Sequence, residues 1–458
     1  MAGSPDSDPY RNGLGARTSG HGPMPESGPF FDRRLETLPR ASLRDLQSSK
    51  LAALLGDVFE RNRFYTDKMR HSGVTPEDIR SVDYLALLPL TTKSELVAAA
   101  EADPPFGTNL THPETAYTRI HQTSGTTGTP LKVVDTEESW DWWGRCWGFV
   151  LTGAGLTAED RLFLPFSFGP FIGFWGAVEG ARHTGVLMVP GGGAGSVERL
   201  HRMADQGVTA MCCTPTYALR LAEVARSEGV DIQSLSVRTI ITAGEPGANI
   251  PEVKQRIESA WGAKCYDHAG ASEVGAHSFE CKPQPGAIHP IESEYIVEVL
   301  DATTNEPLPP GNEGELVITN LGRSGFPAIR YRTGDLVILN TDPCVCGRTF
   351  ARFEGGVLAR ADDMVIVRGV NLFPAAIEGL VRRVEAVEEY QITVLSQGEL
   401  ARLSIVLEVV PGADPEDAQV AVTSEVQNAL GLRPEVTVAP TGSLPRFELK
   451  AKRFHIAD

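Results

Sequence analysis

The stretch HQTSGTTGTPLKV, residues 121–133, gathers hydroxyl side chains and glycines into one short segment of the 458-residue chain. Glycines let backbone N–H groups approach an anion closely, and hydroxyls supply further hydrogen-bond donors. The segment lies between two expected strands, AYTRIHQ and LKVVDT, and therefore predicts a loop that grips phosphates. Its spacing is not that of a Walker A loop, and a solvated surface loop is the alternative interpretation.

The region around this loop, residues 120–300, alternates short apolar runs with helical patterns. Such alternation is typical of parallel sheets covered by helices, in which ligands bind at the carboxyl ends of the strands. Polar or glycine-rich turns follow almost every apolar run, which is where a site is expected. The expected strands are DRLFLPFS (160–167), GVLMVPGG (185–192), VTAMCCTPT (208–216), VRTIITAGE (237–245) and GAKCYDHAG (262–270).

The flanking regions complete a division into three parts. Residues 1–28 are rich in Gly, Ser and Pro and predict a disordered tail. Residues 41–65 show a helical leucine pattern, Thr75-Pro76-Glu77 predicts a helix start, and residues 295–340 alternate like antiparallel strands. Residues 362–458 read as β-α-β-β-α-β. We therefore expect an α/β protein with a large N-terminal domain of mixed sheets and helices, 29–361, and a small α+β C-terminal domain, 362–458.

Composition narrows the class of partner. The chain carries 42 basic and 59 acidic residues, a net charge of −17, which disfavours nucleic acid and anionic membranes as partners. No apolar run is long enough to span a bilayer, and no secretory signal precedes the first helix. Seven cysteines in such a chain predict a reducing compartment, so we expect a cytoplasmic protein. Whether it forms a homodimer is left open.

Four further stretches must be weighed with the opening loop. TAGEPG (242–247) and AGASEVG (269–275) each follow an expected strand, YRTGDL (331–336) carries Asp335 in a turn, and LPRFELKAKRF (444–454) carries Lys450. Taken singly, a turn aspartate and a solvated lysine are the ordinary interpretations. In this order, together with CCTPTYA, CVCGRT and DDMVIVRGVNLFP, the chain from about residue 30 to its end resembles the adenylate-forming ligase superfamily. It is most similar to the phenylacetate–CoA ligase family.

The resemblance implies a two-step reaction. A carboxylate attacks the α-phosphate of ATP to give an acyl-AMP and pyrophosphate, and the thiol of coenzyme A (CoA) then displaces AMP. It also implies two catalytic residues: Lys450, near the carboxylate and α-phosphate, and Glu273, which binds Mg²⁺. The C-terminal domain would be a mobile lid that turns about a hinge at Asp362. The implied ATP and AMP site comprises Thr123, Ser124, Gly125, Thr126, Thr127, Gly128, Gly244, Glu245, Pro246, Asp267, His268, Ala269, Ser272, Asp335 and Arg360.

Some positions depart from the family pattern. Ala269 stands where relatives often carry an aromatic residue, Leu449 where they carry glycine before the lysine, and Ala359 where they carry glycine before Arg360. Thr129 replaces the usual lysine of the phosphate loop, with Lys132 three residues on. These departures leave the individual contacts to the nucleotide open.

The acceptor of the acyl group is also open. A carrier-protein thiol, or an amine or hydroxyl of a second small molecule as in natural-product pathways, would share the first step. The alternative hypothesis from another class of function is a non-catalytic regulator that binds a nucleotide or zinc. The presence of both Lys450 and Glu273 disfavours that hypothesis.

A zinc site is predicted from two pairs of residues. Cys281 and His289 lie upstream of the C-x-C pair Cys344 and Cys346, and together they form a Cys₃His set that suits tetrahedral zinc. His277 is the rival fourth ligand. Free buried cysteines that fill the core are the alternative interpretation.

The acyl group is expected to be aromatic. FLPFSFGPFIGFWG, residues 163–176, sets phenylalanines among glycines after a strand, and flat walls of this kind suit a ring. Trp140, Trp143 and Trp147 have helical spacing and are interpreted as helix packing. The predicted acyl-binding residues are Phe166, Phe168, Gly169, Phe171, Tyr217 and Gly270.

Overall fold

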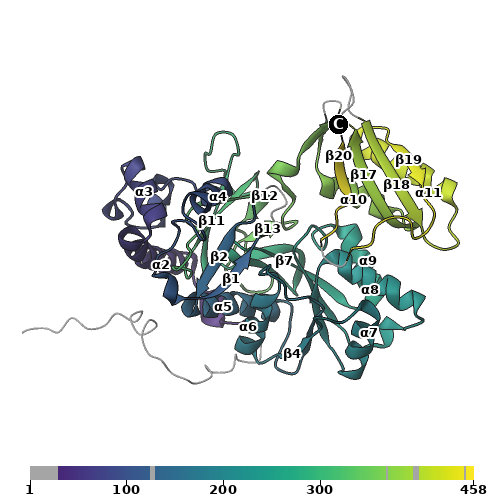
Figure 1. The fold of residues 1–458 in the computed structure, drawn as a ribbon, viewed down its shortest axis with the longest axis horizontal. Coiled ribbons are helices and arrows are strands. Elements are labelled where there is room, and N and C mark those ends of the chain that lie inside the picture. Colours follow the sequence, from purple (N-terminus) through teal and green to yellow (C-terminus); the bar gives the residue numbers. More distant parts are fainter. Residues whose placement is uncertain (1–28, 124–128, 368–369, 396–401, 448–449, 458) are drawn as a thin grey trace, which may run out of the picture.

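The computed structural model describes residues 29–123, 129–367, 370–395, 402–447 and 450–457. The predicted tail 1–28, the loop residues Ser124, Gly125, Thr126, Thr127 and Gly128, and Leu449 lie outside these residues. A large domain holds a twelve-stranded sheet, and a smaller C-terminal domain is built on a four-stranded one. The predicted mixed α/β class is confirmed. Figure 1 shows the smaller domain beside helices α8 (Pro215–Ser227) and α9 (Pro251–Trp261) of the larger one.

The chain begins with four helices: α1 (Arg33–Glu36), α2 (Arg40–Arg61), α3 (Arg63–Ser72) and α4 (Lys93–Ala102). The helical pattern predicted over 41–65 is confirmed, and Asn62 separates its two helices, α2 and α3. The Asn62 side chain accepts a hydrogen bond from the Tyr65 N–H and donates to Asn109 and Thr111, so it caps α3 inside the core. Thr75 begins a 3₁₀ turn, Pro76–Asp78. Among the described residues, no helix is both long and apolar enough to cross a bilayer.

One half of the large sheet is parallel, as predicted. Its strands lie in the spatial order β4-β3-β5-β6-β7 and are connected through α6 (Trp175–Thr184), α7 (Ser196–Asp205), α8 and α9. Gly244 follows β6, and Glu273 follows β7, so both lie at carboxyl ends of strands. The strands are β3 (Arg161–Leu164), β4 (Leu187–Pro190), β5 (Ala210–Cys213), β6 (Thr239–Thr242) and β7 (Lys264–Ala271).

The other half of the sheet is antiparallel and continues from β7 in the order β8-β9-β13-β12-β11-β10, with β14 beside β12. The antiparallel prediction for residues 295–340 is therefore confirmed. These strands bring Asp335 and Arg360 onto adjacent positions of β12 and β14. They are β8 (Gly275–Cys281), β9 (Gln284–Pro290), β10 (Tyr295–Leu300), β11 (Glu313–Asn320), β12 (Tyr331–Asn340), β13 (Arg352–Glu354) and β14 (Ala359–Arg360).

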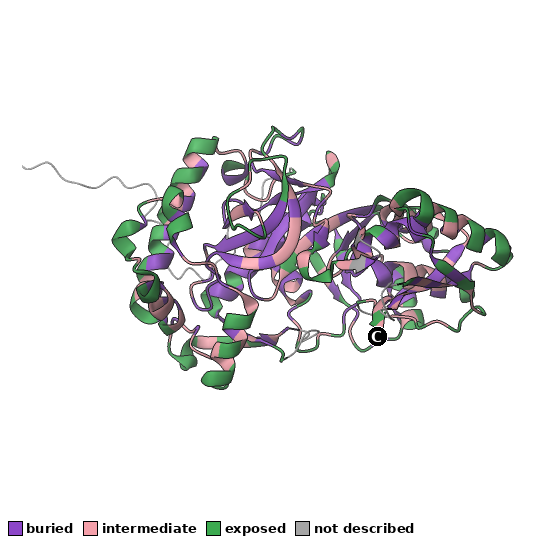
Figure 2. Cartoon of the chain, turned by 90° about the horizontal axis from the view of Figure 1, so that it is seen from above, coloured by how far each residue is buried: buried purple, intermediate pink, exposed green. Residues whose placement is uncertain are grey.

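A hairpin and a tryptophan-rich helix lie next in the chain to the segment predicted to bind phosphates. Strands β1 (Tyr117–Gln122) and β2 (Lys132–Thr136) pair antiparallel and enclose the loop, as predicted. Helix α5 (Glu137–Gly153) follows at once, and Trp140, Trp143 and Trp147 are buried in the main core. Their predicted role in helix packing is confirmed. Figure 2 shows that buried residues concentrate in the sheets, while exposed residues line the outer helices.

The C-terminal domain has its own core, formed by residues such as Ile377, Leu380, Tyr390 and Val422. Its sheet has the order β19-β18-β17-β20. The expected β-α-β-β-α-β succession is present, and β20 adds a parallel strand beside β17. The elements are β15 (Val365–Val367), β16 (Val370–Leu372), α10 (Pro374–Arg383), β17 (Val387–Leu395), β18 (Arg402–Val409), α11 (Pro415–Leu430), β19 (Glu435–Val438) and β20 (Phe454–Ala457).

Candidate active site

Lys450 lies against the turn that follows β6. A methyl group built on Gly244 would lie 3.6 Å from Cε of Lys450. The next residue, Ala451, donates its backbone N–H to Oε2 of Glu245 at 2.7 Å, and Oε1 of Glu245 accepts from the Thr216 N–H at 2.9 Å. Glu245 therefore joins the first turn of α8 to the C-terminal segment. Pro246 follows on the exposed side of this turn.

Burial at this contact shifts two pKa values. Desolvation lowers the pKa of Lys450, and the nearby Glu245 carboxylate opposes that shift. Desolvation also raises the pKa of Glu245, against the hydrogen bonds from Thr216 and Ala451. Glu245 is half-buried in this turn, and its carboxylate partly offsets the desolvation that disfavours the charged form of Lys450.

Asp335 and Arg360 form a second cluster. Nη1 of Arg360 lies 3.3 Å from Oδ1 of Asp335, and Nε of Arg360 donates to Asp362 at 2.9 Å. Burial raises the pKa of Asp335 from its ordinary 3.8 to about 6, and Arg360 opposes the shift. Gly334 has a φ of +77°, and a Cβ there would lie 2.9 Å from Arg360 Nη2, so the turn requires glycine.

Glu273 is buried and faces a lysine that sequence reasoning missed. Nζ of Lys93, at the start of α4, lies 3.1 Å from Oε1 of Glu273. The loop that carries Glu273 is fixed from behind by Arg323, whose Nη1 donates to the carbonyls of Ser272 and Glu273. A carboxylate that already attracts a cation has the chemistry expected of a Mg²⁺ ligand.

The base of the phosphate loop is closed by Thr123. Its N–H donates to the Leu131 carbonyl at 2.9 Å, and its hydroxyl accepts from the Leu131 N–H at 3.1 Å. Thr129 donates its hydroxyl to Glu101 of α4. Lys132 lines a hollow together with Val97 and Glu101 of α4, so it faces that helix.

Strand β7 carries predicted nucleotide- and acyl-binding residues that lie in different surroundings. The ring of His268 packs 4.5 Å from that of Trp147, and its Nδ1 lies 2.7 Å from the Ser278 carbonyl. Burial lowers the pKa of His268 to about 4, so the ring is neutral. The side chain of His268 is engaged by this packing, and its contact with the nucleotide stays a prediction. Ala269 is half-buried against the main core, and Gly270 is exposed.

Asp267 and Gly270, which lie near His268 on β7, are each constrained by nearby groups. Burial, and secondarily the Glu280 carboxylate, raise the pKa of Asp267 to about 7. A Cβ on Gly270 would lie 2.9 Å from the Gly275 carbonyl of β8, so glycine permits this close approach. Both positions remain accessible in part at the end of β7.

The predicted aromatic wall is a cluster of edge-to-face rings. Ring centroids lie 5.3 Å apart between Phe166 and Phe168, and 4.8 Å apart between Phe168 and Trp175. Phe168 has a φ of +50°, and the Gly169 carbonyl accepts from the Trp175 ring N–H. Phe171 is half-buried beside them.

Tyr217 has its described contacts outside this wall, and its contact with the acyl group stays a prediction. It lies in a different core cluster with Met203 and Leu221, and its hydroxyl accepts from Arg199 Nη1 at 2.5 Å. Tyr217 of α8 therefore faces α7. The spacing of residues in the sequence did not reveal toward which helix this side chain points.

Three cysteines and one histidine come together between β8, β9 and the loop after β12. The possible ligand atoms of Cys281, His289, Cys344 and Cys346 all lie within 4.8 Å of one another. Sγ of Cys281 and Sγ of Cys344 are 3.8 Å apart. Nδ1 of His289 lies 2.9 Å from the Ala351 carbonyl, which leaves Nε2 facing Cys346 at 3.5 Å.

The rival ligand His277 points elsewhere. Its Nδ1 lies 2.7 Å from the Ser278 hydroxyl, and burial lowers its pKa to about 3. The group of described residues that gathers around the three cysteines contains His289 and does not contain His277.

Sequence reasoning missed Lys93, Arg323 and Thr216. Lys93 stands in an ordinary helix-start sequence, TTKSEL, and Arg323 in a short turn, so neither carries a local signal. Both become part of the site through partners that lie far away in the chain, at residues 273 and 135. A fully buried arginine cannot be recognised without knowing what covers it.

Comparisons with known proteins agree with this geometry. A family model described as AMP-binding enzyme matches residues 48–323, and one described as AMP-binding enzyme C-terminal domain matches residues 369–456. Phenylacetate-coenzyme A ligase of Thermus thermophilus is 33% identical over 440 residues, covering 92% of this chain and 97% of that protein.

Solved structures of 2-hydroxyisobutyryl-CoA ligase are also similar. In the postadenylation state, in complex with R3-HIB-AMP, that enzyme gives a TM-score of 0.90 at 27% identity, covering 95% of this chain and 93% of the other. In the thioesterification state, with 2-HIB-AMP and CoA, it gives a TM-score of 0.72 at 28% identity, covering 94% and 93%.

Fold, site and family matches together define an adenylate-forming enzyme. The chain belongs to the AMP-binding enzyme family, and its resemblance to the phenylacetate–CoA ligases is confirmed.

Proposed function

We propose that the protein is an AMP-forming acid–CoA ligase that activates an aromatic carboxylic acid. A carboxylate oxygen of the acid attacks the α-phosphorus of ATP, the bond to the β-phosphate breaks, and pyrophosphate leaves. The thiol of CoA then attacks the acyl carbon of the acyl-AMP, the bond to AMP breaks, and the thiol proton passes to solvent. Support for CoA as acceptor comes from the similar CoA-bound ligase structure.

The observation that carries this proposal is the position of Lys450. The C-terminal segment brings it to Gly244, at the carboxyl end of β6, where the Glu245 carboxylate fixes Ala451. An ammonium at that place would stabilise the negative charge that develops on the α-phosphate and the attacking carboxylate.

Other residues would bind the nucleotide. Asp335 would accept hydrogen bonds from the ribose hydroxyls, with Arg360 beside it. The loop that starts at Thr123 would hold the β- and γ-phosphates, and Lys93 would add a positive charge near them. Glu273 would hold Mg²⁺, which shields the phosphates from the approaching carboxylate.

The second step requires Lys450 to leave. We assign the pivot to Asp362, which lies two residues after the end of β14 and pairs with Arg360 on that strand. In this proposal the residues from 362 onward form the lid that turns between the two half-reactions.

The acid is proposed to be aromatic because of the rings at 166–175. Phe166, Phe168 and Trp175 offer edges and faces against which a second ring gains stacking energy. Acids such as benzoate or phenylacetate should then exceed acetate in kcat/KM by roughly 10–200-fold. Equal values for acetate and the aryl acids would contradict the aromatic specificity while leaving the reaction class intact.

The cysteine cluster is proposed to hold a structural zinc ion. Thiolates at about 2.3 Å from a tetrahedral zinc lie roughly 3.8 Å apart, which agrees with the 3.8 Å between Cys281 and Cys344. The contact of His289 Nδ1 with the Ala351 carbonyl leaves Nε2 as the ligand atom, as is usual for metal-bound histidines. Four protein ligands would leave no open position, so the site would take no part in the reaction.

One assay tests the function. Purified protein is incubated with ATP, Mg²⁺ and a panel of aryl and aliphatic acids, with and without CoA, and pyrophosphate, AMP and acyl products are measured. Acid-dependent pyrophosphate release with an acyl-CoA product supports the proposal. Acyl-AMP formation with no transfer to CoA would instead favour a carrier-protein thiol, an amine or a hydroxyl as acceptor.

A further inference from the structure

Helix α8 presents one polar face to the C-terminal domain. Thr216, Arg220, Glu223 and Arg226 recur at intervals of three or four residues, so they share one side of the helix. We call these four residues the docking face. Tyr217 and Leu221, from the opposite side, are buried in the core of the large domain.

The docking face binds residues both before and after Lys450 in the chain. Arg446 donates from Nε to Glu223 at 3.1 Å, and Arg453 donates from Nη1 to the Thr216 hydroxyl at 3.0 Å. Between them, Ala451 donates to Glu245. The segment is thus attached at three points within eight residues, and Lys450 lies between the first two.

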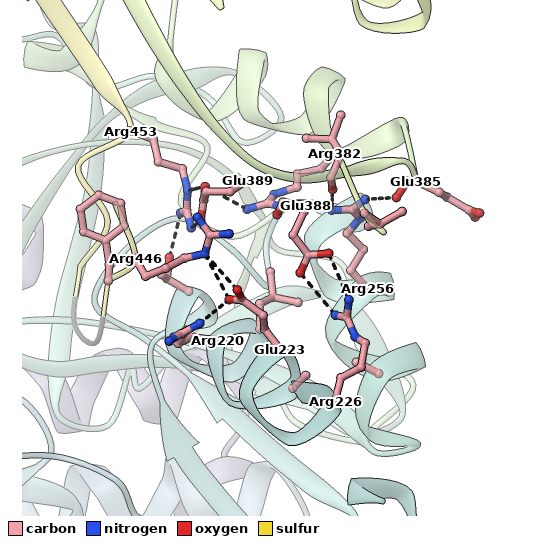
Figure 3. A pocket seen from close by; sticks show the side chains of 17 residues that line it. Arg220, Glu223, Arg226, Arg256, Arg382, Glu385, Glu388, Glu389, Arg446 and Arg453 are labelled. Atoms are coloured by element: carbon pink, nitrogen blue, oxygen red, sulfur yellow. Dashed lines mark hydrogen bonds and ion pairs between the residues drawn. The ribbon is translucent and has the colours of Figure 1, made fainter. Parts of the chain in front are cut away.

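The docking face also contacts β17, an earlier strand of the C-terminal domain. Arg226 pairs with Glu388 of β17 at 3.1 Å. On α9, Arg256 donates to the carbonyls of Val384, Glu385 and Val387 at 2.8 to 3.1 Å. Figure 3 shows these arginines and glutamates pointing toward one another from the two domains.

The interface between these groups is polar and incompletely filled. A cavity of about 210 Å³ remains there, and its lining includes six arginines and four glutamates. Arg446 and Glu223 keep 17% and 26% of their side-chain surfaces exposed. Contacts of this kind separate at a much smaller cost than an apolar core, so they suit an interface that must open in each cycle.

We infer that the docking face, and Glu223 above all, positions Lys450 for the first half-reaction by holding Arg446 and Arg453. This role rests on the proposed two-step function. Glu223 acts through Arg446 and is not a catalytic residue. Arg446 is held within its own domain by the buried Glu408 at 2.7 Å, so its guanidinium is a rigid part of that domain. Arg220 pairs with Glu223 at 2.8 Å and thereby orients the Glu223 carboxylate toward Arg446.

The test compares the half-reactions in Glu223→Ala. Acid-dependent pyrophosphate exchange should fall roughly 5- to 30-fold, because fewer molecules have Lys450 docked. Transfer from supplied acyl-AMP to CoA should stay at the wild-type rate or rise. Glu198→Ala is the matched control, because it removes a glutamate–arginine pair of 2.5 Å within α7, and both of its rates should be unchanged.

A second measurement needs no substrate. Spin labels on Glu228→Cys and Glu416→Cys, both exposed positions, would report the distance between the domains, since all seven native cysteines are buried. Wild type should show one main distance, and Glu223→Ala should add a second population. An unchanged distance distribution, or an equal loss in both half-reactions, would overturn the inference. If wild type activates no acid, the proposed function fails, while the distances still decide whether the docking face holds the domain.

Discussion

Arg323 donates a hydrogen bond of 3.0 Å from Nη1 to the backbone carbonyl of Glu273 and is itself completely buried. Its Nε and Nη2 pair with the two carboxylate oxygens of Asp135 at 2.6 and 2.9 Å. Asp135 belongs to β2, just after the phosphate loop. A single arginine therefore connects the strand behind the phosphate loop to the loop that carries the proposed Mg²⁺ ligand.

Removing this arginine should separate stability from activity. Arg323→Met leaves Asp135 buried without its partner and should destabilise the fold by about 3–5 kcal/mol, lowering the midpoint of thermal unfolding. The double variant Arg323→Met/Asp135→Leu should recover most of that stability. Its Mg²⁺-dependent pyrophosphate exchange should nevertheless remain low, because the carbonyls at 272 and 273 have lost their donor. Full activity in the double variant would show that Arg323 does not orient Glu273.

The raised pKa of Asp335 predicts a pH dependence. Its pKa in the folded state is about 6, above the ordinary 3.8, so the folded state holds this proton more tightly than the unfolded state does. Stability is therefore lost as pH rises through about 4 to 6, by at most about 3 kcal/mol. Asp335→Asn should raise the thermal midpoint of the ATP-free protein at pH 8 and leave it unchanged at pH 4.

The same carboxylate should show the opposite trend in ATP binding. Ribose hydroxyls donate best to the ionised form, so the KM for ATP in wild type should rise as pH falls below about 6. In Asp335→Asn the KM for ATP should be high and independent of pH over this range. A wild-type KM that stays constant from pH 8 to pH 5 would argue against contact with the ribose.

Metal content tests the cysteine cluster. Elemental analysis should find about one zinc per chain in wild type and much less in Cys344→Ser, because a hydroxyl is a far poorer zinc ligand than a thiolate. Cys212→Ala is the control, since that cysteine is buried in β5 in a different core cluster from the three cysteines, and this variant should retain the metal. Zinc retained at wild-type level in Cys344→Ser would place any metal elsewhere.

Lys450→Ala should impair one half-reaction. Loss of a charged donor to a developing negative charge costs about 3–4 kcal/mol, so acyl-AMP formation should slow on the order of 10²–10³-fold. Transfer from supplied acyl-AMP to CoA should be nearly unaffected. Lys452→Ala, an exposed lysine two residues away, is the control and should leave both rates intact.

A change at the proposed hinge should give the reverse pattern. Asp362→Pro fixes φ at the pivot, so acyl-AMP should form while its transfer to CoA slows. Stopped-flow or quenched measurements of the two steps would distinguish the variants.

Equal impairment of both steps in Lys450→Ala would mean that the fold is damaged or that Lys450 does not serve the first step.

The sequence by itself determined the class of fold and the places where a site could lie. Five parallel strands were predicted from short apolar runs, because a strand buried on both faces requires a continuous apolar run. The positions of Gly244, Asp335 and Lys450 followed from motifs whose order along the chain is itself informative. Three cysteines and two candidate histidines pointed to the residues of the cysteine cluster before any contact was known.

The tertiary structure decided the direction of individual side chains. It selected His289 over His277, turned His268 toward Trp147 and Tyr217 toward Arg199, and set Lys93 beside Glu273. It also placed the boundary between α2 and α3 at Asn62, whose side chain donates hydrogen bonds to Asn109 and Thr111 in the core. Local sequence patterns indicate which residues are buried, since apolar residues recur with the period of the helix or strand that buries them. They do not report which distant residue lies opposite, because that depends on how separate elements pack against each other.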